Sequence, residues 1–198
     1  MKRKISEKEQ LVGNTISLRL VNLKDCTLEY VKWLNDPAVN YFLETRWSKQ
    51  NICSIRQFVT SCLNDSYTYL FAIIARPNNR HVGNIKLGPI QVKHKNAQVS
   101  YFIGDKEVWG CGYATEALKL CSWFAFDILK LYRLEASIYG SHHASRHLLE
   151  KSGFTLEACF KKRLILNDTR DDHLYYVYYQ DDWCMQSSAD NIIHWSGT

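Results

Sequence analysis

Residues 107–117, with the sequence EVWGCGYATEA, constrain the fold of this 198-residue chain more than any other segment. They lie between a run of strand character that ends near Ile103 and a long apolar stripe with helical spacing. Two glycines at such a junction let the backbone curl until successive N–H groups point into one concavity, where the helix dipole adds positive potential. The segment therefore predicts a pyrophosphate site that needs no charged side chain, and an ordinary tight turn is the alternative.

Two other phosphate-binding motifs are excluded for this segment. A P-loop requires Gly-Lys followed by Ser or Thr, and the segment lacks that triplet. A Rossmann motif requires a third glycine where the sequence has Thr115, and a following parallel strand that ends in an acid.

The hydrophobic periodicity predicts strands alternating with helices along the chain. Asp25 and Ser48 are the expected N-caps of the first two helices, and the first of these carries Leu28, Val31 and Leu34 on its apolar face. A long helix is expected over 114–129 and a short one through 147–149, ended by Gly153. Strands are expected at residues 16–21, 69–75, 81–87, 97–103, 133–139, 154–166 and 173–180, with turns at 76–80 and 167–168. This order predicts a mixed sheet with helices against it, in the α/β or α+β class.

Composition supports one globular domain. Hydrophobic residues make up 46% of the chain, which excludes a disordered protein. We expect a polar arm at 1–13, a domain at 14–183 and a tail at 184–198. The polar N-terminus and the lack of a long apolar run predict neither a signal peptide nor a membrane span.

The cysteines and the net charge bear on compartment and partners. Seven scattered cysteines without a CxxC pair predict neither a zinc site nor a disulfide framework. We expect most of them in the core of a cytoplasmic protein. The net charge of +5 suits nucleic acid, a ribosome or a polyanionic small molecule, and composition does not choose between these.

Residues 108–118, VWGCGYATEAL, resemble the acetyl-CoA pyrophosphate loop of the GNAT superfamily of N-acetyltransferases. Within it, the sequence is most similar to the branch that contains the ribosomal-protein-alanine acetyltransferases RimJ and RimL. Further matches follow in the same order along residues 14–183: LRL at 18–20, WLNDP at 33–37, NAQVSY at 96–101, ASRHLLEKSGF at 144–154, and Asp172 and Asp182-Trp183. The resemblance implies a mixed, mostly antiparallel twisted sheet, flanked by about four helices and splayed at the acetyl-CoA site.

The resemblance also implies how acetyl-CoA is held, with no metal. Backbone amides from Val108 to Ala114 would bind the pyrophosphate. The splayed strand around Tyr101 would pair with the pantetheine arm and polarise the thioester carbonyl, as a fixed backbone dipole does in an oxyanion hole. The implied cofactor-binding residues are Phe102, Ile103, Val108, Trp109, Gly110, Cys111, Gly112, Tyr113, Ala114, His142 and Ser145.

Acetyl transfer to an amine needs a base and is helped by an acid. The glutamate that this branch carries on its central strand is Gln98 here, which cannot take a proton at neutral pH. The tyrosine acid of many members is Leu149 here, whereas the RimL-like pattern uses the serine that matches Ser145. We expect catalytic roles for Ser145 and Tyr101, with helix capping as the alternative for Ser145. The candidate bases are Glu44, Glu135, Glu157, Asp172 and His143. The sequence does not rank them, and the alternative for each is a solvated surface side chain.

The acceptor pocket of this family forms near Trp47 and the Tyr41–Phe42 pair, and we assign Trp47, Gln98 and Asp172 to substrate binding. His143 and His147 stand four residues apart, and we interpret them as a solvated pair rather than metal ligands. Cys111 would lie far from the thioester, so we expect direct transfer in a ternary complex without an acyl-enzyme.

Two acceptors remain open. One is the α-amine of a protein, and the other is an amino-sugar nucleotide, suggested by VGNIKLGPI at 82–90. The alternative function is a non-catalytic acyl-CoA-binding module, which Gln98 and Leu149 favour. Basic residues form only short clusters, such as 93–95 and 161–163, so we expect no nucleic-acid partner. We also expect no membrane partner, and a monomer or homodimer.

Overall fold

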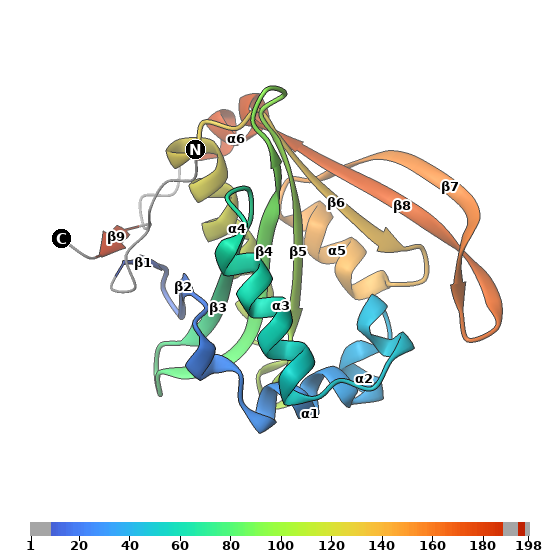
Figure 1. Ribbon diagram of the computed structural model, residues 1–198. Helices are drawn as coiled ribbons and strands as arrows, with labels where there is room; N and C mark the ends of the chain where they lie inside the picture. Colours follow the sequence, from blue (N-terminus) through green and yellow to red (C-terminus); the bar gives the residue numbers. More distant parts are fainter. Residues whose placement is uncertain (1–8, 188–193, 197–198) are drawn as a thin grey trace.

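The protein is described here from a computed structural model that covers residues 9–187 and 194–196. Its strands form one nine-stranded sheet in the order β7-β8-β6-β5-β4-β3-β2-β1-β9 (Figure 1). The strands are β1 (Gln10–Val12), β2 (Ile16–Leu20), β3 (Tyr69–Ala75), β4 (Arg80–Gln91), β5 (Asn96–Ile103), β6 (Arg133–Tyr139), β7 (Thr155–Leu166), β8 (Thr169–Tyr179) and β9 (His194–Ser196). The helices are α1 (Leu28–Asn35), α2 (Pro37–Asn40), α3 (Ile52–Asn64), α4 (Tyr113–Trp123), α5 (His143–Lys151) and α6 (Gln180–Ser187).

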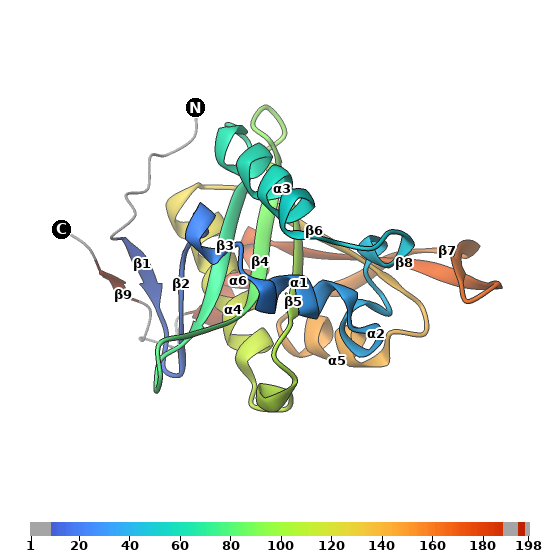
Figure 2. The same ribbon diagram turned by 60° about the horizontal axis from the view of Figure 1, so that its bottom comes forward.

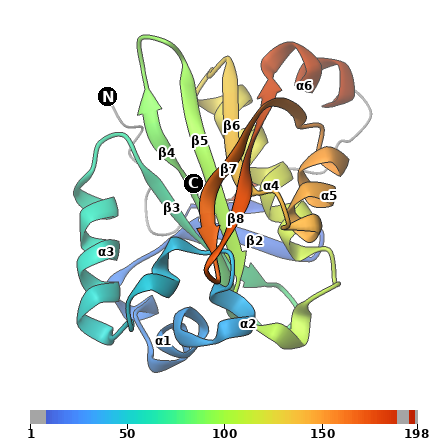
Figure 3. The ribbon, with the colours of Figure 1, turned by 90° about the vertical axis from the view of Figure 1, so that its right-hand side faces the viewer.

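Helices cover both faces of this sheet. Figures 2 and 3 show α3 on one side of the strands and α4 and α5 on the other. Residues of β3 divide between the two sides: Phe71 and Ile73 pack in the core with α4, whereas Leu70 and Ala72 pack with α1 and α3. Because both faces of β3 are covered, the strand is apolar throughout rather than alternating.

The sheet is mixed, and its one parallel pair in the described chain is β5 with β6. These strands pair at Asn96–Arg133, Ala97–Leu134 and Gln98–Glu135, and at no later position. Beyond Gln98, β5 continues beside β4 and β6 continues beside β8, so a wedge opens between them (Figure 1). This confirms the expected fold, including the splay.

The expected N-caps of the first two helices are wrong. Asp25 pairs with Arg19, with a nitrogen–oxygen distance of 2.6 Å, and Thr27 caps α1 instead. Asn51, rather than Ser48, caps α3 through hydrogen bonds from two backbone N–H groups. Leu28, expected on the buried face of α1, is 72% exposed. The helix begins directly after its N-cap Thr27, and its buried face is formed by Tyr30, Trp33 and Leu34.

The turns predicted from the sequence agree with the structure, unlike the predicted N-caps. The hairpin of β3 and β4 turns through residues 76–79, and Asn167 and Asp168 both have positive φ in the turn between β7 and β8. Gly153 follows α5 with a φ of 92°. The backbone angles of each turn are favoured by the residues at the turn itself, which is why sequence predicts them.

The chain ends contribute more to the fold than expected. Residues 10–12, which we assigned to the polar arm, form β1 and pair with β2 and β9, and Leu11 is buried. The region after Trp183, where the sequence has no clear pattern, includes the end of α6. The Trp183 indole donates to Asp127 at 2.7 Å, which fastens α6 to the helical segment after α4. The boundaries of the expected domain stay predictions.

The expectation that most cysteines lie in the core is wrong. Cys26, Cys62 and Cys121 are buried, whereas Cys53, Cys111, Cys159 and Cys184 are exposed. In the described ranges, no helix is both long and apolar enough to span a membrane.

Candidate active site

The loop before α4 owes its shape to two glycines with left-handed backbone angles. Gly110 has a φ of 80° and Gly112 a φ of 81°, a region that other residues rarely adopt. A Cβ at either position would meet no atom within 4 Å, so conformation, not space, requires glycine. Gly112 is the N-cap of α4 and has no side chain to accept from the first helical N–H groups.

Backbone amides of this loop are available to an anion. The N–H groups of Gly110, Gly112, Tyr113 and Ala114 have no acceptor among the described residues. Three other amides from the expected set are already used in turns, because Val108, Trp109 and Cys111 donate to Asp105, Lys106 and Val108. The expected range of Val108 to Ala114 therefore narrows to four amides near the positive end of α4.

One edge of β5 faces the wedge. The Gly104 amide donates to the Val82 carbonyl of β4 at 2.9 Å, so strand alternation turns the backbone groups of Ile103 and Tyr101 the opposite way. The Trp109 indole donates to the Ile103 carbonyl at 3.0 Å. Tyr101, beyond the last β5–β6 pair, keeps an unpaired backbone edge to which an extended amide-bearing molecule can add.

Tyr101 and Ser145 meet beside this wedge, beyond the last β5–β6 pair. The Tyr101 hydroxyl lies 2.8 Å from Ser145 Oγ, which joins β5 to α5. Ser145 is buried in the first turn of α5. Burial raises the pKa of Tyr101 to about 12, although the Ser145 contact opposes the shift. Both hydroxyls therefore hold their protons at neutral pH. Leu149, the position of the missing tyrosine, is buried in the core.

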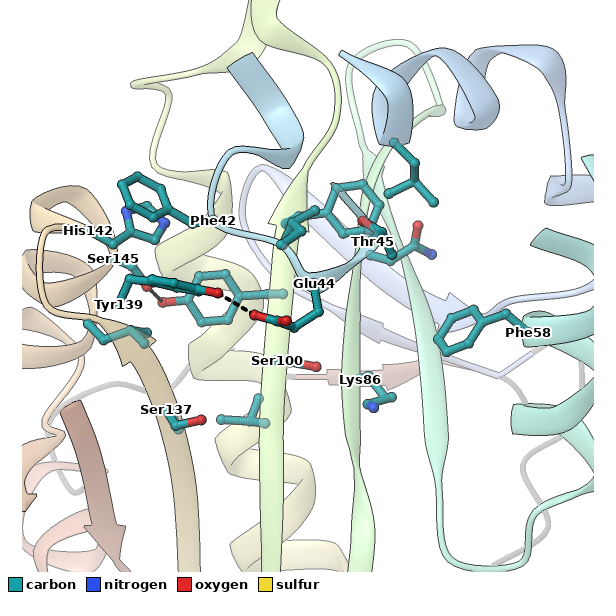
Figure 4. A pocket seen from close by; sticks show the side chains of 18 of the residues that line it. Phe42, Glu44, Thr45, Phe58, Lys86, Ser100, Ser137, Tyr139, His142 and Ser145 are labelled. Carbon is teal, nitrogen blue, oxygen red and sulfur yellow. Dashed lines mark hydrogen bonds between the residues drawn. The ribbon is translucent and has the colours of Figure 1, made fainter. Parts of the chain in front are cut away.

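A cavity of about 720 Å³ extends from this pair to the other face of the sheet. Tyr101 packs with the α4 side, whereas Phe102 packs with the α1 and α3 side, as expected for neighbouring strand residues. Both line the cavity, which therefore passes through the opening between β5 and β6. Figure 4 shows the side chains around it, with Glu44 near the centre.

Glu44 is held by its neighbours. The Tyr139 hydroxyl donates to Glu44 Oε1 at 2.5 Å, and the Trp47 indole donates to Oε2 at 2.9 Å. Arg46 donates to the Tyr139 hydroxyl at 2.6 Å. Burial raises the pKa of Glu44, but the hydrogen bonds from Tyr139 and Trp47, with the charges of Arg46 and His173, outweigh it and leave the pKa below its usual value. The cavity thus contains a carboxylate that is ionised at neutral pH.

The other candidate bases lie outside the lining of this cavity. Glu135 and Glu157 form ion pairs with Arg133. Asp172, assigned to substrate binding, pairs with Lys161 at 2.8 Å. His143 is exposed at the start of α5. Glu44 is therefore the one candidate of the five that the structure brings to the Tyr101–Ser145 pair.

Of the remaining expected site residues, some line the cavity and others do not. His142 lines the cavity and stacks on Phe42, with ring centroids 4.0 Å apart. Its burial, with a smaller contribution from His143, lowers the pKa of His142 to about 4. Trp47 is 60% exposed and reaches the site through Glu44. Gln98 is exposed at the last β5–β6 pair and does not line the cavity. Among described residues, no group of three His, Cys, Asp or Glu side chains is placed to hold a metal.

Sequence reasoning missed several residues that line the cavity: Lys86, Ser100, Ser137 and Tyr139. The signal was available in part, since Ser137 and Tyr139 lie two residues apart in a strand that we had predicted and so share a face. What the sequence did not show was the register that brings them to one face.

Comparisons with known proteins agree with this geometry. A family model described as "Acetyltransferase (GNAT) domain" matches residues 15–155. "Probable N-acetyltransferase YjcK" of Bacillus subtilis (strain 168) is 35% identical over 106 residues, a stretch that spans 53% of this chain and 58% of that protein.

Two solved structures show the same fold. Spermidine N-acetyltransferase from Vibrio cholerae, in complex with CoA and spermine, has a TM-score of 0.77 at 17% identity, and the match covers 86% of this chain and 98% of that one. RimL, a ribosomal L7/L12 alpha-N-protein acetyltransferase in complex with coenzyme A, has a TM-score of 0.77 at 20% identity, covering 86% and 97%. Since the family model spans most of the domain that carries the loop and the splay, the chain belongs to the GNAT family of acetyltransferases and is an N-acetyltransferase.

Proposed function

We propose that this protein transfers an acetyl group from acetyl-CoA directly to a primary amine, within a ternary complex. The observation that carries the proposal is the single cavity that joins the Tyr101–Ser145 pair on one face of the sheet to the Glu44 carboxylate on the other. A thioester and an amine that enter from opposite faces would meet in the opening between β5 and β6. Bringing two reactants together in this way removes much of the entropic barrier to reaction.

The cofactor side fits coenzyme A through its backbone. The free amides of Gly110, Gly112, Tyr113 and Ala114 suit a pyrophosphate. The unpaired edge at Tyr101 suits the amide groups of a pantetheine arm, and its backbone N–H would stabilise the oxyanion that develops on the thioester carbonyl.

Glu44 is the proposed base. As the amine nitrogen forms its bond to the carbonyl carbon, Glu44 takes the proton that the nitrogen loses. The carbon–sulfur bond then breaks, the thiolate receives a proton from the hydroxyl pair of Ser145 and Tyr101, and water returns a proton to that pair. Because the pKa of Glu44 is lowered, it is a weak base and suits an amine that is already partly neutral. An α-amine has a pKa of roughly 7.7–8.0 and meets that condition better than an alkylamine does.

The acceptor classes we propose are a protein N-terminal α-amine and an amino-sugar nucleotide. The cavity lining in the described chain carries one carboxylate, Glu44, together with the ammonium group of Lys86. A polyamine with several positive charges would find few partners there.

The test is calorimetric titration with acetyl-CoA and with CoA, followed by thiol release against short peptides, amino-sugar nucleotides and polyamines. We expect binding of both cofactors and release with a peptide or an amino-sugar nucleotide. Binding without release would instead favour the non-catalytic acyl-CoA-binding module. No binding of either cofactor would contradict the proposal.

A further inference from the structure

Three hydrogen-bond donors lie on one face of three neighbouring strands. Lys86 of β4 is the register partner of Ser100 of β5. Gln98 pairs with Glu135 across β5 and β6, and Ser100 and Ser137 lie two residues beyond these positions. Register partners and residues two apart share a face, so Lys86, Ser100 and Ser137 face the same way. All three line the cavity (Figure 4).

None of the three has a partner within the described chain. The hydrogen bonds and ion pairs of that part include no contact of the Lys86 ammonium, the Ser100 hydroxyl or the Ser137 hydroxyl. Lys86 is half-buried, since β4 lies between β3 and β5, whereas Ser100 and Ser137 are exposed. A half-buried ammonium group has lost part of its contact with water, so an anionic partner beside it is favourable.

Another part of the same cavity carries a negative charge. Glu44 presents the carboxylate there, and the buried Thr45 Oγ1 and His173 Nδ1 atoms have no hydrogen-bond partner among the described residues. The two charged groups of the lining therefore have opposite sign and come from different elements, the 3-10 helix Glu44–Trp47 and β4. A ligand that carries both signs would complement both groups.

We infer that the acceptor is an amine that also bears an anionic group, a carboxylate or a phosphate, and that Lys86 with Ser100 and Ser137 binds that anion while Glu44 receives the amine. This inference rests on the proposed function, because it names the acceptor class of the same site. The anion fixes the acceptor at one end, and the amine then lies toward the opening between β5 and β6. Lys86 is thus a specificity residue that never touches the reacting bond.

The experiment compares acceptors that differ in one negative charge. One pair is a short peptide with aspartate or asparagine next to a free N-terminus, and the other is an amino-sugar nucleotide against the free amino sugar. We measure kcat/KM for each in the wild type, Lys86→Met and Lys86→Arg. Lys93→Met is the matched control, since Lys93 is exposed in the turn between β4 and β5. Titration with CoA confirms that each variant is folded.

We expect the wild type to prefer the anionic member of at least one pair by about tenfold or more, the size of a charge-assisted contact. Lys86→Met removes that preference, Lys86→Arg retains most of it, and Lys93→Met leaves it unchanged. A preference in the peptide pair indicates that the site recognises a carboxylate, and a preference in the amino-sugar pair indicates a phosphate. Equal kcat/KM for both members of each pair, or a preference that survives in Lys86→Met, would overturn the inference while leaving the transferase intact. Absence of thiol release from every amine contradicts the proposed function itself, and this inference with it.

Discussion

The two halves of the candidate site are built from different parts of the polypeptide. On the cofactor side, the groups available are backbone amides of one short loop and the edge of one strand, at Gly110 to Ala114 and Tyr101. On the acceptor side they are side chains from separate elements, chiefly Glu44, Lys86 and Tyr139. Backbone dipoles do not titrate and survive most substitutions, whereas side-chain charges are lost with one mutation. The comparison predicts that cofactor binding and acceptor choice respond to different changes.

The largest effect on CoA affinity should follow from forcing Gly110 and Gly112 out of their left-handed conformation. In the double variant Gly110→Val and Gly112→Val, both positions must leave the left-handed region, at roughly 1–2 kcal/mol each. We expect the affinity for CoA to fall about 100-fold, since 1.4 kcal/mol is a factor of ten. Calorimetric titration measures this. The matched variant with asparagine at both positions should bind much as the wild type does, because asparagine tolerates positive φ. An unchanged affinity in the valine variant would remove the loop from the cofactor side.

The next effect is on the acceptor side. Glu44→Gln keeps the shape of the side chain but cannot take a proton, so we expect kcat to fall about 100-fold, as for a lost general base. The affinity for CoA should stay within about twofold, because Glu44 lies on the other face of the sheet. Glu135→Gln is the control, since Glu135 pairs with Arg133 outside the cavity lining. Equal losses of rate in both variants would show that Glu44 has no special role.

Tyr101 and Ser145 lie where the two sides meet, and their effect should be intermediate. Tyr101→Phe removes the phenol but keeps the backbone edge, so we expect about tenfold slower turnover and unchanged CoA affinity. Because the pKa of Tyr101 is raised to about 12, the phenol stays protonated as the pH rises, and the rate should not fall on the alkaline side of neutrality. A wild-type loss of rate near pH 9 that disappears in Tyr101→Phe would contradict the assignment.

His142 should give the smallest change. Its pKa of about 4 means that the ring is neutral above that pH, so it contributes hydrogen bonding and stacking on Phe42 rather than charge. His142→Asn should alter CoA affinity by less than about threefold, and affinity should be flat between about pH 5 and 8. The folded state disfavours the protonated ring, so this residue lowers stability as the pH falls from the unfolded value near 6.5 toward 4. A tenfold loss of affinity on acidification to about pH 5.5 that is absent in His142→Asn would refute this account.

The contrast between a local backbone loop and side chains from separate elements also explains which features the sequence alone predicts. The conformation of the loop at 107–117 was predicted because it depends on neighbouring residues: two glycines and a helix start. The backbone angles at Asn167 and Gly153 are local in the same way. By contrast, Asp25 was expected to cap α1 but is bound by Arg19 of β2, a contact between two elements. Local rules fail where a partner from elsewhere in the fold competes.

The acceptor side shows most clearly which features a single sequence does not predict. Glu44 was one of five unranked candidates, and only the packing of its segment against β6 brings it to Tyr139 and the cavity. Lys86 was missed because its place in the cavity depends on the register of β4 with β5, which brings it beside Ser100. Both are tertiary properties that a single sequence does not contain.

The central claim, that the backbone holds the cofactor, is tested most directly by titrating ¹⁵N-labelled protein with CoA and following individual amide resonances. We predict that the amides of Gly110, Gly112, Tyr113, Ala114 and Tyr101 shift together with one dissociation constant. If CoA saturates the protein while these resonances stay in place, the cofactor binds elsewhere and the account is wrong.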